Sequence, residues 1–466
     1  MATSPSAPAR TRGPKAAVPV VLGIFLFSLI IDNGFKFMTK AIGDDLALTA
    51  SQASLQATLA GLVIGIGAVV YAALADSVSM RKLLYVCVGL IAVGGIVGFC
   101  FSSSYTMVII ARLIQTTGLA AGETLYVIYV TKYLPAKDQK TYLGFSTAAF
   151  QASTLFGAVA SGYVATYVSW TAMFLIPVVM LATIPIVKRT VPHTEATSSH
   201  VDLLGLFFIA VVATALMLFL QAFNWLWLVV SLVGVAAFIW HICAHENALV
   251  RPEFFMNKRF SCIIVLVFIV YSVQLGYITL FPYVAADMYG YEIDKASLLL
   301  APGYACAIVV GVLSGQIGRV LNSRLTILLA LLGVIAALVI AAVGIGWGSW
   351  VLIVSVVFFP SSYALFYAPL LATAIRDIPA EKTGIAIGFY NLTINVAIPI
   401  GIAYTAKLND LKPTFLSWAV SADTPVGAGY GTILWVLALI VAVGTAGYMI
   451  ADAKLYRSER ARGALS

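Results

Sequence analysis

The chain has 466 residues and a formal net charge of +8, and 61% of its residues are hydrophobic while only 10% are charged. A soluble protein carries about 25% charged residues, so this composition excludes an ordinary soluble domain and requires most of the surface to face lipid. The positive balance leaves a nucleic-acid partner open until the positions of the basic residues are considered.

Residues 1–17 are rich in proline, alanine and serine and carry Arg10, Arg12 and Lys15. The apolar run that follows is long enough to cross a bilayer, and it has no Ala-x-Ala cleavage site. We therefore expect a cytoplasmic tail and a first transmembrane helix, without a cleaved signal peptide.

Fourteen apolar runs follow one another along the chain, each close to the ~20 residues that a helix needs to cross a bilayer. The predicted spans are residues 18–39, 53–74, 83–102, 105–131, 142–167, 170–187, 203–222, 224–243, 261–284, 296–318, 325–346, 348–374, 383–406 and 431–453. The sequence thus predicts an all-α integral membrane protein with 14 transmembrane helices.

The lysines and arginines of the loops predict the orientation of these spans. Of the 27 basic residues, 21 fall on the side of the two termini and only Lys40, Lys295, Lys407 and Lys412 fall on the other. Both termini are therefore expected in the cytoplasm of a bacterium, with the chain in its inner membrane. Because the position of the basic residues in cytoplasmic loops explains the net positive charge, we expect no nucleic-acid partner.

Two long cytoplasmic stretches, 188–202 and 244–260, enclose an apolar helical hairpin at 203–243. Two six-helix bundles around a central two-helix insert is a layout expected of a transporter made of related halves. We interpret the hairpin as lipid-facing, the alternative being an element that contacts substrate. The predicted divisions are a tail at 1–17, a bundle at 18–188, a linker with two extra helices at 189–260, a bundle at 261–454 and a tail at 455–466.

The turn after the second span contains a recognisable motif, LADSVSMRK at 74–82. It resembles the cytoplasmic loop motif of the major facilitator superfamily, although Ala72 and Ser79 stand where glycines are usual. A carboxylate that faces two cations across a tight turn can hold neighbouring helices in one state. We expect Asp76, Arg81 and Lys82 to form such a conformational latch, the alternative being a solvated turn.

The fourth span adds ARLIQTTG at 111–118, which resembles the family's Arg-x-x-Gln-Gly-x-Gly motif at Arg112, Gln115 and Gly118. With the helix layout, this makes the whole chain similar to the fourteen-helix drug:proton antiporters, especially the tetracycline exporters. The resemblance implies the major facilitator fold, and efflux driven by the proton gradient without a bound cofactor.

The chain departs from the pattern of that branch in three places. The antiporter motif of the fifth span appears at Ser153–Gly162 without its proline, Arg319 stands where the exporters carry an aspartate, and Ile398 stands where they carry a glutamate. These departures argue against tetracycline itself as the substrate and weaken the expectation of export.

Four ionisable side chains fall inside predicted spans: Asp32, Lys36, Arg112 and Glu123. Charged groups in a bilayer are costly and usually functional. We predict that Asp32 and Glu123 handle protons and that Arg112 favours the ionised form of the nearer carboxyl group. Lys36 is expected to attract a substrate anion. The alternative for Asp32 and Arg112 is a fixed structural pair.

Polar and aromatic side chains inside the spans are candidates for substrate binding. With Lys36, they are Gln115, Gln151, Tyr271, Gln274, Tyr277, Tyr367, Asn391 and Asn395. Packing of the tyrosines against lipid is the alternative for some of them.

We predict a proton-coupled secondary transporter of small organic molecules, namely an efflux antiporter for drugs or for an anionic or zwitterionic metabolite such as a siderophore. The alternative is a proton-coupled importer of an organic anion. A membrane-embedded enzyme is disfavoured because no loop carries a nucleophile–histidine set or a metal-ligand cluster, and the chain has no GxxxxGK[ST] loop for ATP. The expected partners are the substrate, protons and the lipid bilayer, with the protein acting as a monomer and binding no metal.

Overall fold

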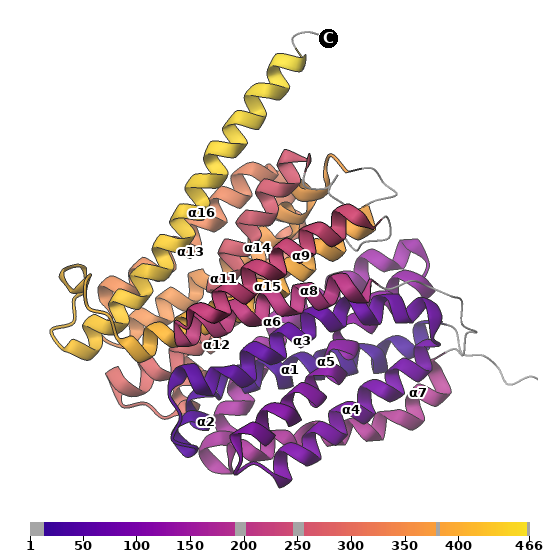
Figure 1. The fold of residues 1–466 in the computed structure, drawn as a ribbon, viewed down its shortest axis with the longest axis horizontal. Coiled ribbons are helices and arrows are strands. Elements are labelled where there is room, and N and C mark those ends of the chain that lie inside the picture. The colour runs from indigo at the N-terminus through magenta and orange to yellow at the C-terminus, as the bar shows by residue number, and fades with distance from the viewer. Residues whose placement is uncertain (1–13, 192–201, 246–255, 379–382, 464–466) are drawn as a thin grey trace, which may run out of the picture.

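A computed structural model describes residues 14–191, 202–245, 256–378 and 383–463, and the part of the chain that it describes is helical with short connections. Figure 1 shows long helices that run roughly parallel or antiparallel to one another. Most of them are longer than the apolar runs that predicted them.

The first half begins with a short 3-10 turn, η1 (Pro14–Ala17), that leads into the first long helix. Its helices are α1 (Val18–Phe37), α2 (Thr39–Asp45), α3 (Ala50–Ser77), α4 (Met80–Cys100), α5 (Tyr105–Tyr133) and α6 (Ala136–Tyr167). The sixth predicted span is broken into η2 (Trp170–Phe174), η3 (Ile176–Thr183) and α7 (Ile184–Thr190). Pro177 and Pro185 start the second and third of these pieces, because proline fits the first turn of a helix and interrupts its interior.

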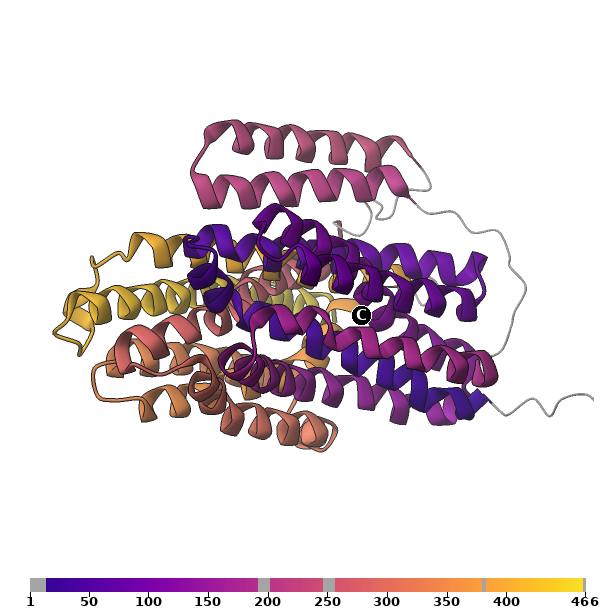
Figure 2. The same cartoon turned by 90° about the horizontal axis from the view of Figure 1, so that it is seen from below.

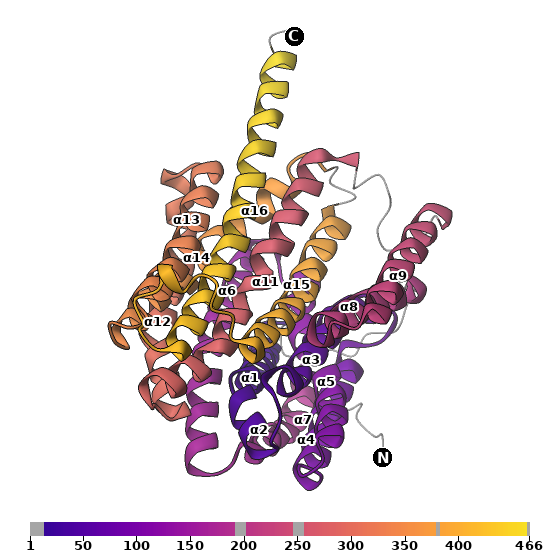
Figure 3. The same cartoon turned by 60° about the vertical axis from the view of Figure 1, so that its left-hand side comes forward.

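The hairpin in the middle of the chain consists of α8 (Leu203–Ala222) and α9 (Trp225–Ala244). The second half contains α11 (Lys258–Tyr289), α12 (Ile293–Val320), α13 (Ser323–Gly344), α14 (Trp350–Ile375), α15 (Thr383–Leu411), η5 (Ser417–Ala419) and α16 (Pro425–Gly463). The connection between the predicted spans 383–406 and 431–453 is shorter in the structure, because α15 and α16 both extend into it. The C-terminal end of α16 projects beyond the other helices (Figures 1 and 3).

Twelve helical segments in the described residues are long and apolar enough to cross a membrane. They include the two helices of the hairpin, whereas α5 and α6, which carry more polar residues, are not among them. The count of fourteen spans therefore stays a prediction, although a helix or a set of helical pieces covers each predicted span.

The two ends of the helices differ in charge. We call the end that holds the turns at 78–79, 134–135 and 321–322 the basic end, because Arg81, Lys132 and Arg324 lie beside those turns. The other end, with the turns at 101–104 and 290–292, is the opposite end. The positive-inside rule predicts that the basic end faces the cytoplasm.

Buried side chains form two large apolar clusters, one mainly within α1 to α7 and the other mainly within α11 to α16. A third, small cluster joins α8 to both halves through Leu62 of α3, Ala213 and Met217 of α8, and Ile400 and Ala403 of α15. Helix α8 therefore lies over the seam between α3 and α15.

The hairpin forms a separate layer on one side of the molecule, as Figure 2 shows. Asp202 ties its two helices together, since its carboxylate accepts the Gly205 amide at 2.8 Å and lies 2.8 Å from His241 Nε2. Trp225, Leu232 and Trp240 of α9 are more than 60% exposed, as expected of a surface that faces lipid.

Candidate functional site

A cavity of about 820 Å³ is lined by both halves of the protein. Its walls come from α1, α3, α5 and α6 on one side and from α11, α14 and α15 on the other. This volume lies within the ~300–1,000 Å³ typical of small-molecule sites. The wall is mostly apolar, and its polar members are Glu123, Thr124, Ser146, Gln151, Tyr271, Gln274, Tyr363, Tyr367, Asn391 and Asn395.

The cavity lies on the basic-end side of a close contact between α3 and α15. A Cβ atom built on Gly65 would lie 2.8 Å from the Cβ of Asn395, so only glycine allows the two helices to approach this closely. The α3 residues that line the cavity, from Ile64 to Ala72, follow this contact toward the basic end, and Ala72 is exposed.

Contacts between the two halves close the opposite end. The Asp410 carboxylate of α15 accepts hydrogen bonds from the backbone amides of Ala50 at 2.8 Å and Ser51 at 3.1 Å, the first residues of α3. These amides have no partner within their own helix, and the positive end of the helix dipole favours a carboxylate there. Tyr167 of α6 donates to Asp294 of α12 at 2.9 Å.

Asp32, Lys36 and Arg112 form one buried cluster of charges. Asp32 accepts hydrogen bonds from Lys36 and, at 3.1 Å, from Arg112, so one carboxylate serves two cations. Arg112 also donates to Gln115 at 2.8 Å and to Gln56 at 3.3 Å. The side chains of Asp32, Lys36 and Arg112 are 3%, 9% and 1% exposed, and none of the three lines the cavity.

Glu123 is the acidic residue that the described structure puts on the cavity wall. Gly122 allows α5 to pack closely on α1, since a Cβ atom there would lie 2.4 Å from the Ser28 hydroxyl. This contact holds Glu123 beside Phe25 and Leu29 of the cavity wall. Glu123 Oε1 is buried and has no hydrogen-bond partner.

Seven of the predicted functional residues line the cavity: Glu123, Gln151, Tyr271, Gln274, Tyr367, Asn391 and Asn395. Tyr367 donates to the Asn391 side chain at 3.3 Å, and the Asn395 amide donates to the Asn391 carbonyl at 3.0 Å. Gln274 Oε1 is buried without a hydrogen-bond partner, so it is available to a ligand. The roles of these residues stay predictions.

Three predicted substrate residues do not reach the cavity. Lys36 is bound to Asp32 and Gln115 to Arg112, while the Tyr277 hydroxyl is 2.8 Å from Ser355 in the core of the second half. The expectation that Lys36 meets a substrate anion therefore finds no support in its position. Its place four residues after Asp32 on one helix face leads to the ion pair.

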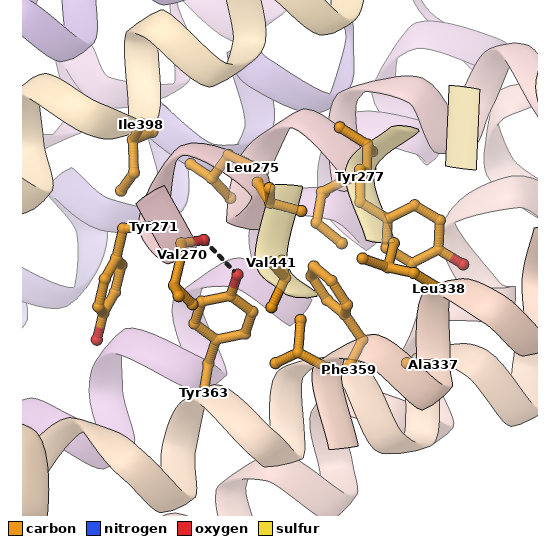
Figure 4. Packing of buried hydrophobic residues seen from close by; sticks show 14 of the residues in the cluster. Val270, Tyr271, Leu275, Tyr277, Ala337, Leu338, Phe359, Tyr363, Ile398 and Val441 are labelled. Carbon is orange, nitrogen blue, oxygen red and sulfur yellow. Dashed lines mark hydrogen bonds between the residues drawn. The ribbon is translucent and has the colours of Figure 1, made fainter. Parts of the chain in front are cut away.

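The predicted set of functional residues does not include Gln56 or Tyr363. Gln56 could have been found as a polar residue inside an apolar run, and its side chain joins Arg112 to the Phe35 carbonyl at 3.0 Å. Tyr363 lines the cavity, and its hydroxyl donates to the Val270 carbonyl at 2.6 Å, which leaves the ring beside Tyr271 (Figure 4). Nothing in the sequence separates it from tyrosines that only pack.

The predicted latch is described in part. The side chain of Asp76 lies outside the described residues. Arg81 donates to the Val191 carbonyl at 2.5 and 3.0 Å, so it holds the chain that follows α7, and Lys82 is exposed. Within the described ranges, no group of three or more His, Cys, Asp or Glu side chains could hold a metal ion.

Two helical halves that line a shared cavity, closed at one end, are the arrangement expected of a secondary transporter. The family model of the Major Facilitator Superfamily matches residues 20–402, and the chain belongs to this superfamily.

Relatives with curated descriptions are distant. An uncharacterized MFS-type transporter of Mycobacterium tuberculosis is 28% identical over 271 residues, which cover 54% of this chain but only 39% of that protein. The chain thus spans well under half the length of this relative. Multidrug resistance protein Stp of M. tuberculosis is 24% identical over 82% of this chain and 72% of its own, and multidrug export protein EmrB of Escherichia coli K12 is 23% identical over 66% and 63%.

Solved structures share the fold at low identity. The POT family transporter PepTSo superposes with a TM-score of 0.68 at 13% identity, over 94% of this chain and 99% of that one. A D-xylose–proton symporter gives a TM-score of 0.61 at 16% identity, over 92% and 96%.

Proposed function

We propose that the protein is a proton-coupled antiporter that exports small organic molecules across the cytoplasmic membrane of a bacterium, acting as a monomer without a cofactor. The observation that carries the proposal is a cavity between the two halves that is closed at the opposite end and has Glu123 as the acidic side chain among the described residues of its wall. A group that binds a proton in the same cavity as the substrate can couple the two movements.

The named relatives support the direction of transport. Stp is described as a multidrug resistance protein and EmrB as a multidrug export protein, and both align over most of this chain. Because their identities are below 25%, their substrates are not transferred to this protein.

We infer that α5 and α6 also cross the membrane, which gives the fourteen spans that the sequence predicts. With 29 and 32 residues and a rise of ~1.5 Å per residue, each is long enough to span a bilayer about 30 Å thick. Both helices pack on α1, and the cavity or the rest of the bundle buries many of their polar residues.

Flux in proteoliposomes tests the proposal. Ethidium, norfloxacin and nalidixic acid supply a cation, a zwitterion and an anion, each tested with a pH gradient of either sign. We expect uphill movement of at least one compound against the direction of proton flow. Movement in the direction of proton flow would indicate an importer, and flux that ignores the gradient would contradict coupling.

Glu123→Gln is expected to remove the stimulation of flux by a pH gradient, by about tenfold or more, since the amide cannot exchange a proton. Glu123→Asp is the matched variant, because it shortens the side chain but keeps the carboxyl group. A Glu123→Gln protein whose flux still follows the gradient would show that another group carries the proton.

A further inference from the structure

We infer that the surface formed by α4 and α7 at the basic end binds the headgroup of an anionic phospholipid. Three exposed cations lie on this surface, Lys82 at the start of α4 and Lys188 and Arg189 at the end of α7, and we call them the α4–α7 cations. The inference concerns the lipid that surrounds the protein, and it is independent of the transport activity proposed above.

A direct contact between the two helices brings these cations together. Arg81, the residue before Lys82, donates two hydrogen bonds to the carbonyl group of Val191, which follows Arg189 by two residues. The start of α4 therefore touches the chain at the end of α7, and Figures 1 and 3 show the two helices side by side. Because each cation is within three residues of this contact, the three form one patch.

Exposed apolar side chains continue from the cations toward the middle of the helices. Val86 and Val93 are exposed and follow Lys82 by four and eleven residues, which places all three on one face of α4. Ile186 is exposed and lies about one turn before Arg189 on α7. In a membrane this apolar surface contacts acyl chains, so the cations at its end lie at the level of the lipid headgroups.

The charge of the α4–α7 cations is not balanced by a described carboxylate. The segments α4, η3 and α7 contain no aspartate or glutamate, and none of the three cations forms an ion pair with a described residue. On the neighbouring α6, Asp138 already pairs at 2.9 Å with Lys15 of η1, the 3-10 turn that packs against α7. Three positive charges thus remain for a ligand.

The combination of charge and apolar surface identifies a lipid as the ligand. A soluble anion would use only the cations, whereas a phospholipid places its phosphate on the cations and its acyl chains on the apolar surface beside them. A zwitterionic headgroup also brings a positive charge, which the cations repel, so a headgroup with a net negative charge is favoured. Each basic residue near the membrane surface strengthens the binding of anionic lipid by about fivefold.

Quenching by spin-labelled lipids measures binding at this surface. In a full-length protein without the five native cysteines, Val86→Cys carries a bimane fluorophore one turn from Lys82. The protein is placed in phosphatidylcholine vesicles with nitroxide-labelled phosphatidylglycerol or with nitroxide-labelled phosphatidylcholine of the same acyl chains. We expect phosphatidylglycerol to quench at concentrations lower by about fivefold or more. Salt at 1 M should reduce this preference, because the screening length falls to about 3 Å.

Two double variants show whether the α4–α7 cations cause the preference. Lys82→Gln with Arg189→Gln should bring the ratio of the two quenching concentrations close to one. The matched control, Lys258→Gln with Arg376→Gln, removes two exposed cations from the basic end of the second half and should leave the ratio unchanged. Size-exclusion chromatography checks that both variants are folded.

Equal quenching by the two lipids in the protein with all its cations, an unchanged ratio in the folded Lys82→Gln, Arg189→Gln protein, or an equal loss in the control variant would each overturn the inference. Sodium phosphate is also compared with sodium chloride at equal ionic strength, and we expect the two salts to lower the preference equally. Loss of the preference in phosphate alone would indicate a site for free phosphate and would overturn the assignment to a lipid.

Discussion

Replacing Asp32 with asparagine is expected to lower the free energy of unfolding by about 3–5 kcal/mol, because it leaves buried charges without their counterion. Asp32 is the carboxylate that both Lys36 and Arg112 contact, and the three side chains are almost completely buried. The asparagine amide keeps a hydrogen-bond acceptor but carries no charge. Denaturation of the purified protein, followed by tryptophan fluorescence, measures the loss.

Two variants test whether Asp32→Asn lowers stability because Lys36 and Arg112 lose their counterion or because any change at position 32 is harmful. Lys36→Met added to Asp32→Asn should recover part of the lost stability, because one buried cation rather than two then lacks a partner. Asp452→Asn breaks an ion pair whose side chains are 26% and 56% exposed, and exposed pairs contribute about 0–1 kcal/mol. An Asp32→Asn protein as stable as the Asp452→Asn control would contradict the role of Asp32 as the shared counterion.

The helices could be predicted from apolar runs, but their ends could not. An apolar run marks the part of a helix that lies in lipid, whereas the hydrogen-bonded helix continues into polar residues until a capping residue ends it. Asn257 accepts the amides of Arg259 and Phe260, so α11 begins three residues before the predicted span. Thr49 and Gln52 form a capping box that starts α3 in the same way.

The candidate site could be predicted as a set of residues but not as an arrangement. A charged residue inside an apolar run can be identified from a single sequence, and this criterion identifies Asp32, Lys36, Arg112 and Glu123. Which of them reaches the cavity depends on how the helices are rotated against their neighbours, and close contacts such as that of Gly122 with Ser28 decide this. The structure therefore places Glu123 on the cavity wall and the other three charged residues away from it.

Replacing Asp410 with alanine is expected to shift the protein away from the state described here, in which the opposite end is closed. The variant loses the two hydrogen bonds that the Asp410 carboxylate accepts from the backbone amides of Ala50 and Ser51, and a carboxylate that caps the start of a helix contributes about 0.5–2 kcal/mol. These bonds join the two halves, so the loss falls on the closed state alone. A difference of about 1.4 kcal/mol corresponds to a tenfold change in the ratio of the two states.

A cysteine at Thr405 reports this shift. Thr405 is 1% exposed and lines a small pocket between the halves at the closed end, so a membrane-impermeant maleimide added from that side reaches it only when the end opens. In a background without the five native cysteines, Asp410→Ala should raise the labelling rate strongly. Asp44→Asn, which removes an exposed carboxylate paired with Lys40 inside one half, should not.

A shift away from the closed state should also weaken the binding of a ligand in the cavity that Glu123 lines. A ligand that enters from the basic end binds only to molecules whose cavity is open there, and its apparent dissociation constant rises as that fraction falls. Asp410→Ala should therefore weaken binding measured from the basic end although Asp410 does not line the cavity. Unchanged Thr405→Cys labelling together with unchanged binding would contradict a role for Asp410 in holding the two halves together.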